Sequence, residues 1–308
     1  MLKYFINRLV QLIPVVLGVT MLIFLIMQMA SGDPARLILG ELATQEQVNE
    51  LREEMGLNQP VVVQYGRYLW NCFHGDFGSS YVKSRSVTSE VLSRFPYTMS
   101  LAVVSLLLTV VFSVPLGIWA AVHQNKPLDN GIMVFSLIGI SMPVFWLGLL
   151  LMIVFSLHFR LLPSSYDGSF ASYILPAACL VFPNMATVTR TTRSSMLETI
   201  RQDYVRTAKA KGCSRRIAIY KHAFSNALIP TITVVGIQMG QLMGGSVLVE
   251  QIFGWPGLGR LMIESINYRD TPMVLGCVIL LTIACSVLNL VVDLCYAWVD
   301  PRIRSQYS

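Results

Sequence analysis

Apolar residues are concentrated in six long runs that polar segments separate. Each run holds roughly the 20 residues that an α-helix needs to cross the hydrocarbon core of a bilayer. The fourth run is the weakest, because Pro176, Pro183 and Asn184 interrupt it. The pattern therefore predicts an all-α integral membrane protein with six transmembrane helices. The runs cover residues 9–30, 97–122, 132–157, 173–189, 228–249 and 272–299.

The polar segment between the first two runs is too long to be a turn, so it divides the chain. Within it, Thr44 and Gln47 have the spacing of a capping box, and Gly56 follows where a helix would end. We therefore expect an ordered structure on the outer face of the membrane. The predicted parts are an N-terminal transmembrane helix (1–30), an extracytoplasmic segment (31–96) and a core with five transmembrane helices (97–308).

Basic residues are strongly concentrated in one of the segments between apolar runs. The stretch from Arg190 to Lys221 carries nine Lys and Arg residues against only Glu198 and Asp203. Cytoplasmic loops of membrane proteins hold an excess of Lys and Arg. With six spans, this stretch, the N-terminus and the C-terminal tail lie on the same side. The predicted orientation is therefore N-in and C-in.

Composition supports the membrane assignment and excludes several other classes. The 308 residues are 54% hydrophobic and only 13% charged, and their mean hydropathy is +0.58. A soluble domain carries about 25% charged residues. The net charge of +6 follows from the inside loops and does not require nucleic acid as a partner. Six cysteines and four histidines are scattered without CxxC or clustered spacing, so no metal site is predicted.

The basic segment, which we define as residues 190–227, has the pattern of two short helices around a glycine. Ser195 and Glu198 have capping-box spacing, and helix-forming residues continue to Gly212. Gly212 is expected to end the helix in a left-handed conformation, and Ser214 to cap the next one. Two interpretations fit this pattern. The basic residues contact anionic lipid or set topology, or the helices form a docking surface for a cytoplasmic partner.

Several motifs resemble those of one transporter family. Residues Asp203 to Gly212 resemble the coupling motif of ABC importer permeases, in which a Glu-Ala-Ala triplet stands four residues before a glycine. Here the triplet is Arg206-Thr207-Ala208, so Ala208 and Gly212 match. The variant form is similar to that of the dipeptide/oligopeptide branch, the peptide/nickel family. Further matching segments are Gly32-Asp33-Pro34, His74-Gly75-Asp76-Phe77-Gly78, residues 252–259 and residues 300–304.

The resemblance implies a type I ABC importer permease in a bacterial inner membrane. The sequence contains no GxxxxGK[ST] phosphate-binding loop, so ATP and Mg are expected on partner subunits and this chain is not expected to be an enzyme. The implied partners are a homologous second permease, two cytoplasmic ATPase subunits, an extracytoplasmic substrate-binding protein and the lipid bilayer. The residues implied in ATPase coupling are Asp203, Arg206, Thr207, Ala208, Lys211 and Gly212.

Two further groups of residues are candidates for other roles. Gly236, Gly240 and Gly244 form a small-residue row that permits close helix approach, within the chain or against a second permease. Gln238 and Gln241 lie in the same run, where they line an aqueous route or bond between helices. By resemblance, the candidates for binding-protein docking or an external gate are Gly75, Asp76, Phe77, Gly78, Trp255, Pro256 and Gly257.

Alternatives of substrate and of class stay open at this point. Di- or oligopeptides are the first choice of substrate, and glutathione or chelated nickel come next. An ion-coupled secondary transporter would place ionisable groups at membrane depth. Asp293, four residues after Asn289, is the clearest such group. No inverted repeat supports that class, and no HExxH or similar cluster supports a membrane-embedded enzyme.

Overall fold

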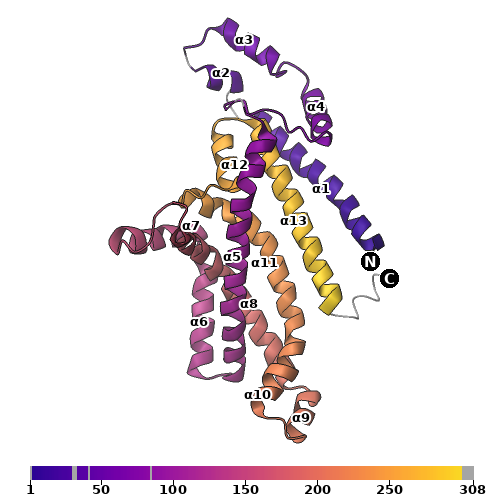
Figure 1. Ribbon diagram of the computed structural model, residues 1–308, viewed down its shortest axis with the longest axis vertical. Coiled ribbons are helices and arrows are strands. Elements are labelled where there is room, and N and C mark those ends of the chain that lie inside the picture. The colour runs from indigo at the N-terminus through magenta and orange to yellow at the C-terminus, as the bar shows by residue number, and fades with distance from the viewer. Residues whose placement is uncertain (1, 30–32, 41, 84, 300–308) are drawn as a thin grey trace. The chain divides into compact units, whose positions relative to one another are not determined.

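The computed structural model describes residues 2–29, 33–40, 42–83 and 85–299, without the side chains of 2–9, 37 and 293–299 (Figure 1). Gly32, the motif at residues 300–304 and the side chain of Asp293 therefore lie outside the described part. The described part is helical and holds no strand beyond an isolated bridge between Ser79 and Ser86. The helices are α1 (Leu2–Met29), α2 (Pro34–Leu39), α3 (Gln45–Glu54), α4 (Val61–Phe73), α5 (Val87–Val122), α6 (Pro127–Ser141), α7 (Val144–Leu151), η1 (Met152–His158), η2 (Phe170–Tyr173), α8 (Ile174–Ile200), α9 (Asp203–Ala210), α10 (Arg215–Ile217), η3 (Ala218–Ala223), α11 (Phe224–Ile252), α12 (Leu258–Asn267) and α13 (Thr271–Val299).

Five helical stretches in the described part are long and apolar enough to cross a membrane, and a sixth candidate is a bent pair. The five are Val10–Met29, Val87–Val122, Phe170–Ile200, Arg215–Ile252 and Thr271–Val292. They include five of the six predicted runs, so the sequence pattern located these helices correctly.

The third predicted run, 132–157, is not the single helix that its composition suggested. It divides into α6 and the pair α7–η1, whose axes differ by 103°. Met142 at the break has an extended backbone, with φ −87° and ψ 124°. Pro143 explains this conformation, because the residue before a proline is pushed out of the helical region.

The fourth run, the weakest in sequence, forms a continuous helix of 27 residues, α8. Pro176 lies in its first turn, where no amide hydrogen is needed. Asn184 donates from Nδ2 to the carbonyl oxygen of Leu180 at 2.6 Å and does not break the helix. Because α8 continues to Ile200, Ser195 lies inside it, and the predicted capping box of Ser195 and Glu198 is wrong.

The chain forms two compact units. One contains Met99–Trp255 and α13 from Val287 onward. In this unit α6 and α11 both pack on α8, and α7 contacts α8 and α11. Gly117 of α5 permits a close approach to α8, since a Cβ atom there would lie 2.6 Å from Thr192 Cβ and 2.8 Å from the Thr189 carbonyl oxygen. We call this unit the core unit.

The other unit contains Leu2–Thr98 and Pro256–Ser286, and we call it the outer-segment unit. Its apolar cluster joins the first turns of α5 with α12 and α13 through Val87, Val91, Leu258, Leu261, Met273 and Cys277. Thr98 Oγ1 accepts a hydrogen bond from the amide of Leu258 at 2.8 Å, which satisfies an amide at the start of α12. The predicted Thr44–Gln47 capping box is present at α3, and Gly56 follows that helix with φ +70°.

Candidate functional site

Helix α9 is a short amphipathic helix that connects two long membrane helices. Its side chains Val205 and Ala208 are buried. Val205 packs in an apolar cluster with Met196 of α8 and with residues of α5, η3 and α11. The polar face, with Asp203, Arg206 and Thr207, is exposed. Burial of one face therefore fixes α9 to the core unit and leaves the other face open to a partner.

Gly212 ends α9 as the sequence predicts, with φ +85°. The amide of Gly212 donates to the Lys209 carbonyl at 3.0 Å, and the amide of Cys213 donates to the Ala208 carbonyl at 3.2 Å. This pair of bonds is a Schellman motif, which needs a left-handed residue at the position of Gly212. Ser214 then caps the next helix by accepting from the Ile217 amide, as predicted.

Rigid helices lie on both sides of α9. Before it, α8 runs as one helix to Ile200, and only Arg201 and Gln202 intervene. After it, α10, η3 and α11 form one helical stretch, Arg215–Ile252. Figure 1 shows α9 and α10 at the shared end of α8 and α11. Short connections therefore join α9 to two membrane helices.

A buried ion pair lies near the same end of α8, and sequence analysis did not single it out. Arg193 Nε and Nη2 donate to the two carboxylate oxygens of Asp129 at 2.6 and 2.7 Å. Asp129 also accepts from the amide of Asn125 at 2.9 Å and is only 1% exposed. The pair links the α5–α6 turn to α8. A signal was present, because Asp129 is one of only two acidic residues between Tyr97 and Thr189.

The predicted pathway residues of α11 differ in their surroundings. Gly236 and Gln238 are buried, whereas Gln241 and Gly244 are exposed in the described chain. A Cβ atom at Gly240 would meet Asn289 Oδ1 at 3.5 Å, and one at Gly244 would meet nothing within 4 Å. The buried Oε1 of Gln238 has no hydrogen-bond partner among the described atoms. The row therefore has one end inside the core unit and one end on its surface.

The predicted docking residues near Gly75 form a tight loop. Gly75 and Gly78 have φ values of +79° and +84°, and the amide of Gly78 donates to Asp76 Oδ1 at 2.8 Å. Phe77 is half-buried and packs on the apolar cluster of the outer-segment unit. Gly75 and Asp76 remain exposed. This loop therefore exposes polar backbone and one carboxylate.

The other docking candidates do not share the exposed position of Gly75 and Asp76. They are Trp255, Pro256 and Gly257. Trp255 is fully buried in the core unit, with its ring 4.7 Å from Tyr166 and 4.4 Å from Tyr173. Its side chain is not at the surface and serves to hold the segment in place. Pro256 and Gly257 belong to the outer-segment unit, where Gly257 is the N-cap residue of α12.

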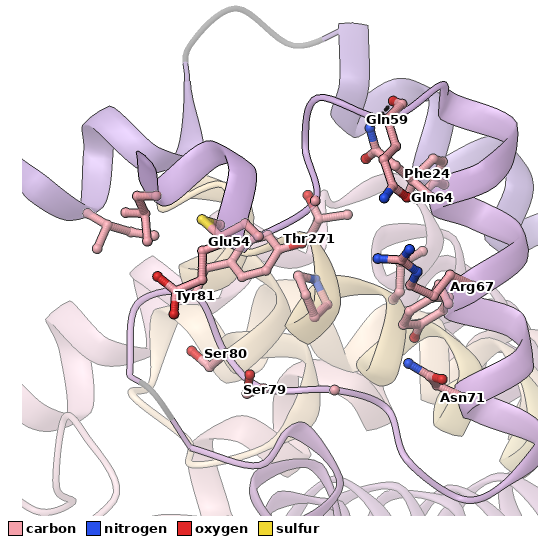
Figure 2. Close-up of a pocket in the computed structure, with 18 residues that line it drawn as sticks. Phe24, Glu54, Gln59, Gln64, Arg67, Asn71, Ser79, Ser80, Tyr81 and Thr271 are labelled. Atoms are coloured by element: carbon pink, nitrogen blue, oxygen red, sulfur yellow. Dashed lines mark hydrogen bonds between the residues drawn. The ribbon is translucent and has the colours of Figure 1, made fainter. Parts of the chain in front are cut away.

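The outer-segment unit contains a polar cavity of about 510 Å³ that the sequence did not indicate. Figure 2 shows Gln64, Arg67 and Asn71 pointing into it from α4, with Ser79 and Ser80 on the opposite side. Ser80 Oγ donates to the buried carboxylate of Asp270, and the Tyr81 amide donates to the same group at 3.1 Å. Burial and the charge of Asp270 raise the pKa of Tyr81 to about 12.

Comparison with known proteins identifies the class. Residues 113–305 match the family described as binding-protein-dependent transport system inner membrane component, and residues 1–102 match the N-terminal part described for the same membrane components. The chain belongs to this family, and it is the permease subunit of an ABC importer in the inner membrane. The predicted resemblance to the peptide/nickel family is confirmed, and family membership disfavours an ion-coupled secondary transporter.

Individual relatives cover almost the whole chain. It is 43% identical over 304 residues to the glutathione transport system permease protein GsiC of Salmonella paratyphi A, with 99% of each chain covered. It is 42% identical to the protein of the same name from Escherichia coli K12, again with 99% of each covered. Among solved structures, the inward-facing MetNI methionine ABC transporter matches with a TM-score of 0.57 at 18% identity, over 68% of this chain and 96% of that one. An amino acid ABC transporter matches with a TM-score of 0.53 at 15% identity, over 68% and 94%. These two likenesses support the fold alone.

Proposed function

We propose that this chain forms half of the translocation pathway of an ATP-driven importer for short peptides, with glutathione as the first substrate to test. The observation that carries the substrate class is the identity of 43% with a glutathione permease across 99% of both chains. Di- and oligopeptides stay within the same class. Chelated nickel is the remaining candidate, and no described relative's name supports it as directly as the glutathione permeases support glutathione.

The proposed complex has a homologous second permease, two cytoplasmic ATPase subunits and an extracytoplasmic binding protein. ATP and Mg are bound by the ATPase subunits. The exposed face of α9, including Asp203, Arg206 and Thr207, fits a groove on an ATPase subunit, and the Gly212 turn sets the angle of the helix. Gly236, Gln238, Gly240, Gln241 and Gly244 are proposed for the pathway or the contact between permeases. The exposed loop around Gly75 and Asp76 is proposed to meet the binding protein.

Transport by the reconstituted complex tests this proposal. The chain would be co-purified with its subunits, reconstituted with its binding protein and loaded with internal ATP. We expect ATP-dependent uptake of labelled glutathione that unlabelled glutathione competes away. The same vesicles with a non-hydrolysable ATP analogue are the control. Uptake of a labelled dipeptide but not of glutathione would identify dipeptides as the substrate within the class of short peptides. Uptake driven by an ion gradient without ATP would contradict the proposed ATP-driven mechanism.

A further inference from the structure

The exposed face of α4 is apolar, unlike that of a helix on a soluble domain. The packed face combines the polar side chains of Gln64 and Asn71 with aromatic and apolar ones, and the outward face carries mainly apolar ones. The packed or half-buried residues are Gln64, Tyr65, Tyr68, Leu69, Asn71 and Cys72. The exposed arc contains Val62, Val63, Gly66, Trp70 and Phe73, with Arg67 at its edge.

The exposed fractions are large for apolar side chains. Val62 is 75% exposed, Trp70 68% and Phe73 77%. A surface helix in water normally turns its apolar stripe toward the core and its polar face toward the solvent. Clustered exposed apolar residues mark a surface that meets an apolar environment. The outward face of α4 therefore requires a cover other than water.

Contacts with α1 place α4 beside the apolar length of a membrane helix. Tyr65 Oη donates to the carbonyl oxygen of Leu17 at 2.9 Å and lies 3.0 Å from Thr20 Oγ1. Leu17 precedes the end of α1 at Met29 by twelve residues, or about 18 Å of helix axis. Gln64 is also bonded to Gln28, nearer that end. Since Val10–Met29 is a candidate membrane span, α4 reaches below its outer end.

The polar cavity described above lies on the packed side of α4. Gln64, Arg67 and Asn71 line it together with Ser79 and Ser80 (Figure 2). A polar cavity of this size has room for water that can hydrogen-bond such groups. Polar groups therefore line the packed side of α4, while the apolar arc faces away from them.

We propose that α4 lies in the outer interface of the bilayer, with Val62, Trp70 and Phe73 among the lipid acyl chains. Helices with a strong apolar face bind in the interface plane in this way. Tryptophan is enriched at that depth because its ring is apolar and its N–H is polar. Arg67, at the edge of the arc, extends its guanidinium away from the proposed lipid face and into the polar cavity. On α1, which α4 contacts through Tyr65, Leu22 and Ile26 are exposed as well.

Collision accessibility of nitroxide labels tests this placement. Single cysteines would replace Val62 or Phe73 on the outward arc, and Asn71 on the packed face as the matched control, in a cysteine-free full-length chain. The complex would be studied in lipid nanodiscs. Oxygen concentrates in the acyl chains, and a nickel chelate stays in water. We expect labels at positions 62 and 73 to have a several-fold higher oxygen-to-nickel accessibility ratio than the label at Asn71.

Two results would overturn the proposal. Nickel accessibility at positions 62 and 73 equal to that of the exposed residue Glu46, labelled in the same way, would place the arc in water. Low accessibility to both oxygen and nickel would show that a protein subunit covers it. The unlabelled Val62→Cys and Phe73→Cys chains would also be reconstituted into vesicles. ATP-driven uptake equal to that of the parent chain would show that both variants are folded.

Discussion

The ion pair of Asp129 and Arg193 is asymmetric, and the asymmetry is testable. The carboxylate is 1% exposed, whereas the Arg193 side chain is 23% exposed. Arg193→Gln leaves a buried carboxylate with only the Asn125 amide as partner, and breaking a buried pair in this way costs about 3–5 kcal/mol. Asp129→Asn leaves a guanidinium that water can reach, so we expect a smaller loss. Thermal unfolding in detergent measures both.

The double variant separates this explanation from simple loss of packing. Asp129→Asn combined with Arg193→Gln removes both charges, so its loss of stability should be smaller than the sum of the single losses. Strict additivity would mean that the two side chains do not stabilise the α5–α6 turn through their contact.

Gly117 gives a second prediction about single residues. A methyl group there would lie 2.6 Å from Thr192 Cβ and 2.8 Å from a backbone oxygen of α8, so Gly117→Ala must push the two helices apart. Overpacking of this kind costs about 1–3 kcal/mol. Gly131→Ala on α6 is the matched control, since nothing lies within 4 Å of the new Cβ atom. We expect a lower melting temperature for Gly117→Ala only.

Among the elements, α9 and its Gly212 turn carry the prediction about coupling. A Cβ atom at Gly212 meets no neighbour, so the cost of substitution comes from φ +85° alone. Valine is strained there by about 1–2 kcal/mol, and asparagine tolerates the left-handed region better. We expect Gly212→Val to lower ATP-driven uptake several-fold and Gly212→Asn to retain most of it. Immunoblots should show equal amounts of each variant in the membrane, so that the uptake rates can be compared. Full uptake by Gly212→Val would contradict a role of this turn in coupling to the ATPase.

The sequence predicted elements best where one local rule decides the outcome. Gly212 and Ser214 end and begin helices as expected, because capping depends on neighbouring residues only. The break at Pro143 does not follow from hydropathy, because residues 132–157 are apolar on both sides of the proline. Ser195 has capping spacing but lies in a helix whose packing on α6 and α11 continues it to Ile200.

In the candidate site, contacts between residues far apart in the sequence were not predictable from local rules. Motif resemblance selected residues of α9, but the buried contact of Val205 depends on α5, α8 and α11 meeting in space. The Asp129–Arg193 pair joins positions 64 residues apart in sequence. The polar lining of the cavity at α4 also requires residues from distant segments. Side chains brought together by packing have no signature in a single sequence.

For the whole molecule, the bent pair α6 and α7–η1 determines the topology. If the pair crosses the bilayer, three spans separate α3 from α9, and the two helices lie on opposite sides of the membrane. If it is a re-entrant loop, only α5 and α8 separate them, and both lie on the same side. The described helices allow five spans or six, and the two numbers differ in whether α3 and α9 share a side of the membrane. We propose six, with both termini inside.

Labelling of two exposed positions distinguishes these topologies. Single cysteines replace Glu46 on α3 and Lys211 after α9, both exposed, in a chain without its native cysteines. A membrane-impermeant maleimide is added to cells whose outer membrane alone has been opened. With six spans, we expect Glu46→Cys to be labelled at once and Lys211→Cys only after the inner membrane is permeabilised. Labelling of both before that step would mean five spans, and it would place α9 on the outer side, where no ATPase subunit could bind it. The basic residues around Gly212 oppose that arrangement, because moving so many Lys and Arg residues outward contradicts the positive-inside rule.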